Sequence, residues 1–243
     1  MRESQAVRRA RAAEIVKVLE QVYPDAACAL RFDGAFQLLV ATILSAQCTD
    51  KMVNQVTPRL FASFPDAPSL AAAPPPEVER IIQPTGFFRQ KAKSIQAAAR
   101  DIVERFGGAV PGTLEELTTL RGVGRKTANV VLGNAFGVPG LTVDTHMTRV
   151  NRRLGLTTHD DPVKIERDLM ELVPHAEWTL YSHRVIEHGR ACCGARRPEC
   201  ERCPLRELCP FPDSSAARAK RPRAGGTKRS RGREQSRSRG REQ

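Results

Sequence analysis

Apolar residues recur three and four positions apart along most of the chain, a spacing that places them on one face of an α-helix. Capping residues, prolines and glycines bound these segments, and no segment alternates apolar and polar residues as a half-buried strand does. The pattern predicts an all-α fold. Helices are expected at about 8–23, 36–46, 51–63, 78–82, 88–106, 114–120, 125–136, 145–154, 161–173 and 177–191.

Local features refine three of these helices. The segment 36–46 (FQLLVATILSA) is apolar on nearly all sides, which predicts a buried central helix. Asp50 is expected to cap the helix that follows it. Thr113 and Glu116 have the spacing of a capping box, in which the threonine accepts from the backbone and the glutamate reaches back to it.

Charge divides the chain into two parts. The 243 residues are 40% apolar, enough for one large domain or two small ones. Of the formal net charge of +12, residues 214–243 hold +9, from eleven Lys or Arg and two Glu. This segment repeats SRGREQ and offers little apolar surface, so we predict a disordered basic tail that adds a diffuse attraction for nucleic acid.

The sequence contains no targeting or membrane signal. No run approaches the ~18 apolar residues of a membrane span, and no apolar segment follows the basic N-terminus as in a secretory signal. We therefore expect a cytoplasmic protein that does not associate with membranes. A reducing compartment favours thiolates that bind metal over structural disulfides.

Five of the seven cysteines lie within residues 192–209. Cys193, Cys200, Cys203 and Cys209 are spaced C-x6-C-x2-C-x5-C, and Cys192 is extra to this pattern. Four thiolates so close in sequence can converge on one centre, and soft sulfur ligands select zinc or an iron–sulfur cluster. Zinc sites usually show two CxxC-like pairs, and this segment has one, so the residues favour iron–sulfur without excluding zinc.

A Gly-x-Gly turn at 122–124 joins two predicted helices and is followed by Arg125 and Lys126. Glycine permits positive φ and lets a backbone approach a phosphate, while the next helix presents free N–H groups at its start. A Gly-x-Gly turn alone is weak evidence of a phosphate-binding site, because many tight turns use this sequence. Lys126 lies where the helix dipole disfavours a cation, so it is either a nucleophilic amine or a surface lysine on phosphate. Asp144 precedes another helix and fits a simple N-cap.

Together, GVGRKTANVV at 122–131 and VDTHMTRV at 143–150 resemble the catalytic segments of the endonuclease III family. The cysteine spacing, which follows His-Gly-Arg at 188–190, is similar to the [4Fe-4S] signature of that family. The resemblance covers roughly residues 8–211. It implies that Lys126 is a nucleophile and Asp144 its acidic partner.

The same resemblance assigns a cofactor and DNA contacts. It implies a [4Fe-4S] cluster on the four spaced cysteines, with Cys192 outside the ligand set. The turn would be a helix-hairpin-helix that contacts phosphate. Gln47 and Phe87 would fill the gap left by a flipped base. Leu is commoner than Phe at position 87, and Pro is commoner than Arg at position 121. The implied DNA-binding residues are Gln47, Phe87, Gly122, Val123, Gly124 and Arg125.

Family membership implies two helical domains with a DNA-binding cleft between them. The expected divisions are an N-terminal helix within 1–27, a six-helix barrel at 28–138, a cluster domain at 139–213 and the tail at 214–243. The implied activity is that of a monomeric DNA glycosylase and AP lyase acting on oxidised or ring-saturated pyrimidines in duplex DNA. Two alternatives remain: an adenine mismatch glycosylase, which typically lacks the lysine at position 126, and a non-catalytic zinc module that binds DNA.

Overall fold

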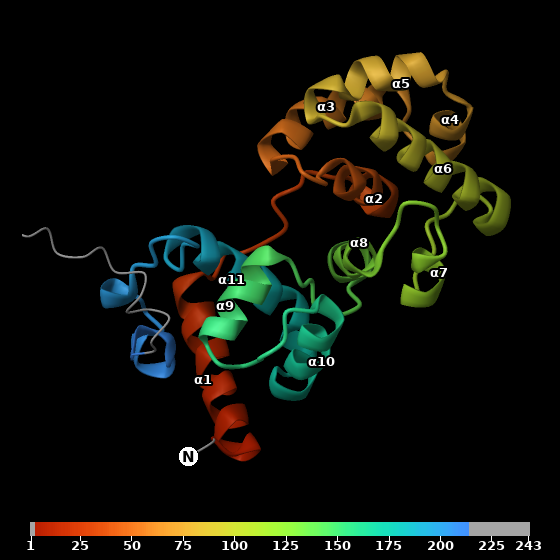
Figure 1. Ribbon diagram of the computed structural model, residues 1–243. Helices are drawn as coiled ribbons and strands as arrows, with labels where there is room; N and C mark the ends of the chain where they lie inside the picture. Colours follow the sequence, from red (N-terminus) through yellow and green to blue (C-terminus); the bar gives the residue numbers. More distant parts are fainter. Residues whose placement is uncertain (1–2, 214–243) are drawn as a thin grey trace, which may run out of the picture.

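The computed structural model describes residues 3–213, which are helical with no β-strand (Figure 1). This confirms the all-α prediction; the basic tail lies outside the described residues. The α-helices are α1 (Gln5–Val22), α2 (Gly34–Leu44), α3 (Asp50–Ser63), α4 (Ala67–Ala72), α5 (Pro75–Ile82), α6 (Phe88–Phe106), α7 (Leu114–Thr118), α8 (Arg125–Val131), α9 (Thr145–Arg153), α10 (Pro162–Leu172) and α11 (Trp178–Ala191). Shorter segments are the 3₁₀ helices η1 (Gln83–Thr85), η3 (His175–Glu177), η4 (Cys200–Arg202), η5 (Arg206–Leu208) and η6 (Phe211–Asp213), and the π-helix η2 (Leu132–Phe136).

Two of the expected helix caps differ from the structure. Asp50 is the first residue of α3, and the cap is Thr49, whose extended backbone lets its side chain accept from the Met52 N–H. Thr113 caps α7 as expected, accepting from the Glu116 N–H at 3.2 Å. The Glu116 carboxylate, however, accepts from the Thr113 hydroxyl instead of from the backbone. The capping box is therefore incomplete.

The structure contains helical turns that the pattern missed around the prolines. No helix was expected between residues 63 and 78, but α4 begins at Ala67, capped by Asp66. Helix α5 begins at Pro75, three residues before the expected start. Proline is tolerated in the first turn because the N–H it lacks would have no helical partner there. The prolines therefore start helices here as well as ending them.

Two separate hydrophobic clusters contain the buried apolar residues. The first draws on residues 30–132 and has α2 at its centre, where every residue from Leu38 to Leu44 is buried. The second combines α1 with residues 141–205. Figure 1 shows the corresponding arrangement: α2–α6 form one lobe, while α1, α9, α10 and α11 form the other, with α8 between them. Within the described range, no helix has the length and apolar content needed to span a membrane.

Arg121 holds the turn between α7 and α8 through Asp101 on α6. Its backbone N–H donates to the Asp101 carboxylate at 2.8 Å, and its guanidinium donates to both carboxylate oxygens at 2.8–3.1 Å. Hydrogen bonds from Arg121 lower the pKa of Asp101 despite its burial. A proline at position 121 would have neither the N–H nor the guanidinium. The chain therefore fixes this turn by an ion pair and a backbone hydrogen bond to the same carboxylate.

Replacing Arg121 with proline, the residue that the family resemblance led us to expect, should lower the free energy of unfolding. The substitution removes every hydrogen bond that Arg121 donates to Asp101 and leaves that buried carboxylate poorly paired. Arg121→Ala keeps the N–H and should lose less. Urea unfolding measures both losses. The ionised Asp101 carboxylate contributes to the free energy of unfolding at neutral pH, and this contribution disappears as pH falls through the lowered pKa of Asp101. The stabilities of the two variants should therefore approach that of the wild type in acid.

Candidate active site

The turn at 120–124 places Lys126 in the first turn of α8. Gly122 has φ +82°, and a Cβ there would lie 3.1 Å from the Ser94 Cβ, so both backbone conformation and space require glycine. Gly124 precedes α8 with no side-chain cap, and a Cβ there would meet no protein atom within 4 Å. Val123 between them is buried. The turn is therefore packed against protein at Gly122 and Val123 and is open at Gly124.

Lys126 and Asp144 line the same groove, which has a volume of about 1080 Å³. Lys126 is exposed at the start of α8. Asp144 is half-buried at the start of α9, where one carboxylate oxygen accepts from the Met147 N–H at 2.8 Å. The other oxygen has no hydrogen bond to the described residues. The structure therefore brings together an amine and a carboxylate that lie 18 positions apart in the sequence.

The rest of the groove wall is rich in arginine. Arg149, Arg152 and Arg153 all line it, together with the exposed Asp160. Arg152 forms an ion pair with Asp160, while Arg149 donates to the Gly189 carbonyl at 2.9 Å. These side chains give the groove a positive lining suited to a polyanion.

Gln47 and Phe87 are the two non-glycine residues with positive φ in the described part of the chain, at 51° and 48°. This conformation is unfavourable for residues with a Cβ and persists where the surroundings enforce it, often at functional sites. Phe87 is also 69% exposed, the largest fraction among the exposed large hydrophobic residues. Gln47 is likewise exposed, just after α2. Both residues thus combine strain with exposure.

Lys91 is a residue near the Phe87 loop that the sequence reasoning missed. It is only 5% exposed, and its ammonium donates to the Thr85 carbonyl at 2.7 Å, just before the Gly86–Phe87 turn. Burial lowers the pKa of Lys91. Its place on the inner face of α6 could have been found from the helical period, but a lysine is ordinarily interpreted as a surface residue.

The side chain of Arg125 is already paired. Its guanidinium donates to both oxygens of the buried Glu166 carboxylate, at 2.7 and 2.9 Å. Glu166 lies on α10, a helix whose apolar residues belong to the second hydrophobic cluster. The expected DNA contact of Arg125 would therefore have to use its backbone N–H.

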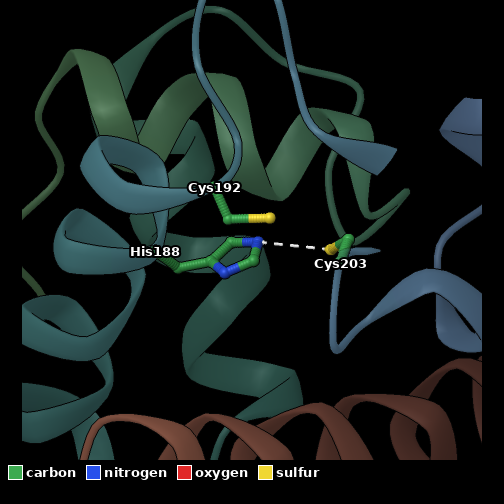
Figure 2. A group of neighbouring side chains, drawn as sticks. All are labelled: His188, Cys192 and Cys203. Atoms are coloured by element: carbon green, nitrogen blue, oxygen red, sulfur yellow. Dashed lines mark hydrogen bonds between the residues drawn. The ribbon is translucent and has the colours of Figure 1, made fainter. Parts of the chain in front are cut away.

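All five cysteines of the 192–209 segment line one small cavity. Arg153 donates to the Cys193 sulfur at 3.1 Å and to the carbonyls of Gly194 and Ala195, which fixes the start of this loop. Figure 2 shows a tighter group made by His188, Cys192 and Cys203, whose ligand atoms lie within 4.8 Å of one another. His188 Nε2 lies 3.7 Å from the Cys203 sulfur. The loop is thus a candidate metal centre, and Cys192, which was expected to lie outside the ligand set, is close to Cys203 and His188.

Comparisons with known proteins agree on one family. A profile for the HhH-GPD superfamily of base excision DNA repair proteins matches residues 40–175. Endonuclease III of a Synechocystis species is 56% identical over 211 residues, which cover 86% of this chain and 96% of that protein. Endonuclease III of Bacillus subtilis is 46% identical over 189 residues, which cover 77% of this chain and 86% of that protein.

Solved structures give the same result. A non-covalent endonuclease III–DNA complex superposes with a TM-score of 0.81 at 41% identity, covering 88% of this chain and 99% of that one. A trapped endonuclease III–DNA covalent intermediate gives a TM-score of 0.80 at 42% identity, covering 84% and 97% of the two chains. The protein belongs to the endonuclease III family, whose members are base excision repair DNA glycosylases with AP lyase activity.

Proposed function

We propose that Lys126 is the nucleophile and Asp144 the carboxylate that assists it, acting on oxidised or ring-saturated pyrimidines in duplex DNA. The observation that carries this assignment is that both side chains line one groove in a chain of this family. One carboxylate oxygen of Asp144 caps α9, and the other has no donor within residues 3–213. The cap orients the carboxylate, and the second oxygen is available for the reaction.

The chemistry begins with a nucleotide flipped out of the duplex, because C1′ cannot be reached within the base stack. As the glycosidic bond breaks, its electron pair leaves with the base, and positive charge develops on the sugar near the Asp144 carboxylate. The Lys126 amine forms a bond to C1′ and, with opening of the sugar ring, becomes an iminium. Loss of a C2′ proton then expels the 3′ phosphate by β-elimination, and hydrolysis of the iminium frees Lys126.

The features around the groove support a role in opening the duplex. Strained, exposed Gln47 and Phe87 are suited to enter the gap left by the flipped base. The turn at 122–124 contacts phosphate through the backbone, which reads no base sequence. We assign the two hydrophobic clusters to the barrel and cluster domains at 28–138 and 139–213, with α1 packing on the latter, and propose a cytoplasmic monomer.

We assign a [4Fe-4S] cluster to Cys193, Cys200, Cys203 and Cys209. The donor set supports it: these four cysteines line one cavity, which Cys192 also lines, and Arg153 donates to the Cys193 sulfur at 3.1 Å. Such a cluster would supply cross-links that hold the loop. Arg196 and Arg197 on this loop are exposed, where they could contact phosphates.

Borohydride trapping tests the proposed activity. Duplexes that carry a thymine glycol, a dihydrouracil, an 8-oxoguanine opposite adenine or an abasic site are incubated with the protein and the reductant. Reduction converts the iminium into a stable amine, and peptide mapping identifies the attached residue. We expect adducts at Lys126 with the pyrimidine lesions and the abasic site. Trapping at another residue, or excision of adenine alone, would contradict the proposal.

Asp144→Asn is expected to lower the single-turnover excision rate by about 10²–10³-fold, the size of a lost electrostatic stabiliser. Asparagine caps helices about as well as aspartate, so the start of α9 should survive and the loss reports the charge. Asp161→Asn is a matched control, because Asp161 caps α10 through the Lys164 N–H at 2.9 Å and lies outside the groove lining. Normal turnover by Asp144→Asn would reduce Asp144 to a cap.

Phe87→Ala is expected to lower excision from duplex DNA about tenfold, because the wedge offsets part of the cost of unstacking. Cleavage of a single-stranded abasic site should be unchanged, since no stack has to be filled. Phe136→Ala provides a control at another partly exposed phenylalanine, 39% exposed and outside the groove. Equal losses on both substrates would show that Phe87 does not act as a wedge.

A further inference from the structure

Glu166 is a buried carboxylate that receives three hydrogen bonds from the helix carrying Lys126. It lies on α10 and is 7% exposed. Arg125 donates to its two oxygens at 2.7 and 2.9 Å, and the Asn129 amide donates to one of them at 3.2 Å. Arg125 directly precedes Lys126 in the chain. The start of α8 is therefore tied to α10 by charge-assisted, bidentate hydrogen bonds.

The same network reaches the segment that leads to Asp144. The Asn129 amide that donates to Glu166 also donates to the Leu141 carbonyl at 2.8 Å. Asn129 is 5% exposed and packs closely there, because a Cβ on Gly140 would lie 3.2 Å from its amide oxygen. Leu141 is three residues before Asp144. Both sides of the groove are thus connected through one carboxylate.

We propose that Glu166 is a positioning residue that sets the separation of Lys126 and Asp144. The two groups come from different helices, α8 and α9, and the intervening segment 137–143 contains no helix of its own. The backbone N–H groups of Gly140 and Thr142 tie this segment to α11 through Thr179 and Ser182. The Glu166 network adds the tie between the segment and α8. The alternative is that Arg125 leaves Glu166 to bind a DNA phosphate, which would abandon a buried carboxylate that its guanidinium now satisfies. The inference rests on the roles proposed above for Lys126 and Asp144.

Glu166→Gln tests the proposal, because it keeps the shape and removes the charge that orients Arg125. We expect the single-turnover rate at saturating protein to fall about 10–100-fold, as for a misplaced reacting group. The dissociation constant for the damaged duplex should not change. Glu171→Gln, at an exposed glutamate of the same helix, is the matched control. A full rate in Glu166→Gln, or an equal loss in Glu171→Gln, overturns the proposal.

Arg125→Met separates positioning from phosphate binding by its salt dependence. If Arg125 acts through Glu166, the rate falls while the slope of log affinity against log salt stays the same. If it neutralises a phosphate, that slope becomes shallower by about 0.9 and the rate at saturation is kept. The second result overturns the proposal. Arg125→Met leaves the buried Glu166 carboxylate without its ion-pair partner, which should destabilise the protein. All assays are therefore run below the melting temperature measured for this variant.

Lys126→Gln, assayed in parallel, distinguishes failure of this inference from failure of the proposed function. Undiminished borohydride adducts in Lys126→Gln would remove the proposed nucleophile, whatever Glu166→Gln does. Inactive Lys126→Gln beside a fully active Glu166→Gln would remove only the positioning role. A slow Glu166→Gln with normal DNA affinity supports the role, because general loosening of the fold would also weaken binding.

Discussion

Replacing Lys126 with glutamine is expected to abolish borohydride-trapped adducts, a loss of roughly 10³-fold or more. An iminium requires a primary amine, which glutamine does not have. Glutamine is a good helix former and carries no charge, so α8 should persist and the unfavourable position of a cation in its first turn is relieved. Gel analysis of trapped complexes measures the chemistry, and binding to the damaged duplex measured without reductant should be largely kept.

Lys164→Gln is the matched control for this experiment. Lys164 is an exposed lysine in the first turn of α10, as Lys126 is in the first turn of α8, but it is not part of the groove lining. Its loss removes a comparable charge at a comparable helical position. Trapping should be full in this variant. Undiminished trapping in Lys126→Gln would mean that another amine performs the attack.

The helical period was enough to place most of the fold, because an amphipathic helix is a local property. The buried helix around Leu38–Leu44 is one example, since its apolar residues leave no polar face for solvent. The hydrophobic pattern missed α4, because this helix has only six residues in a proline-rich segment. So few residues cannot display a helical repeat of apolar positions. Sequence periodicity loses its signal in elements of this length.

Sequence motifs identified two of the charged residues that line the groove, but not the contacts that hold them in place. Lys126 and Asp144 stand in recognisable segments, but their neighbours depend on contacts between distant positions. Glu166, 41 positions from Arg125, has nothing in its local sequence to mark it as a buried partner. Asp101 and Lys91 are similar, since a charged residue in an amphipathic helix is ordinarily predicted to face solvent. Burial of a charge depends on a partner that folding supplies.

The unfavourable backbone conformations could not be predicted from the sequence either. Residue type gives no indication that Gln47 or Phe87 adopts positive φ, because glycine and asparagine are the residues that signal it. The resemblance selected both positions independently of their conformation. The structure adds a physical reason to examine them, since an enforced, unfavourable backbone costs stability and is kept where a side chain must be presented.

Substituting Cys203 with serine is expected to remove the visible iron–sulfur absorbance and leave poorly soluble protein. Cys203 belongs to the spaced set and its sulfur also lies within 4.8 Å of Cys192 and His188. Loss of one of the four proposed ligands should abolish the proposed cluster, and the loop has little secondary structure of its own to hold it without the cluster. Absorbance spectra and iron analysis of freshly purified protein measure the loss, and thermal unfolding measures the accompanying instability.

Cys192→Ser and Cys193→Ser decide which of the two adjacent thiols is the ligand. The spacing selects Cys193, and the Arg153 guanidinium donates to its sulfur at 3.1 Å, which ties that side chain to α9. Cys192 instead lies near the Glu199 carbonyl, at 3.8 Å, and near Cys203. We expect Cys193→Ser to lose the absorbance and Cys192→Ser to keep it with unchanged iron content. The reverse outcome would shift the ligand set by one residue, and a colourless wild type with stoichiometric zinc would replace the cluster with a zinc site.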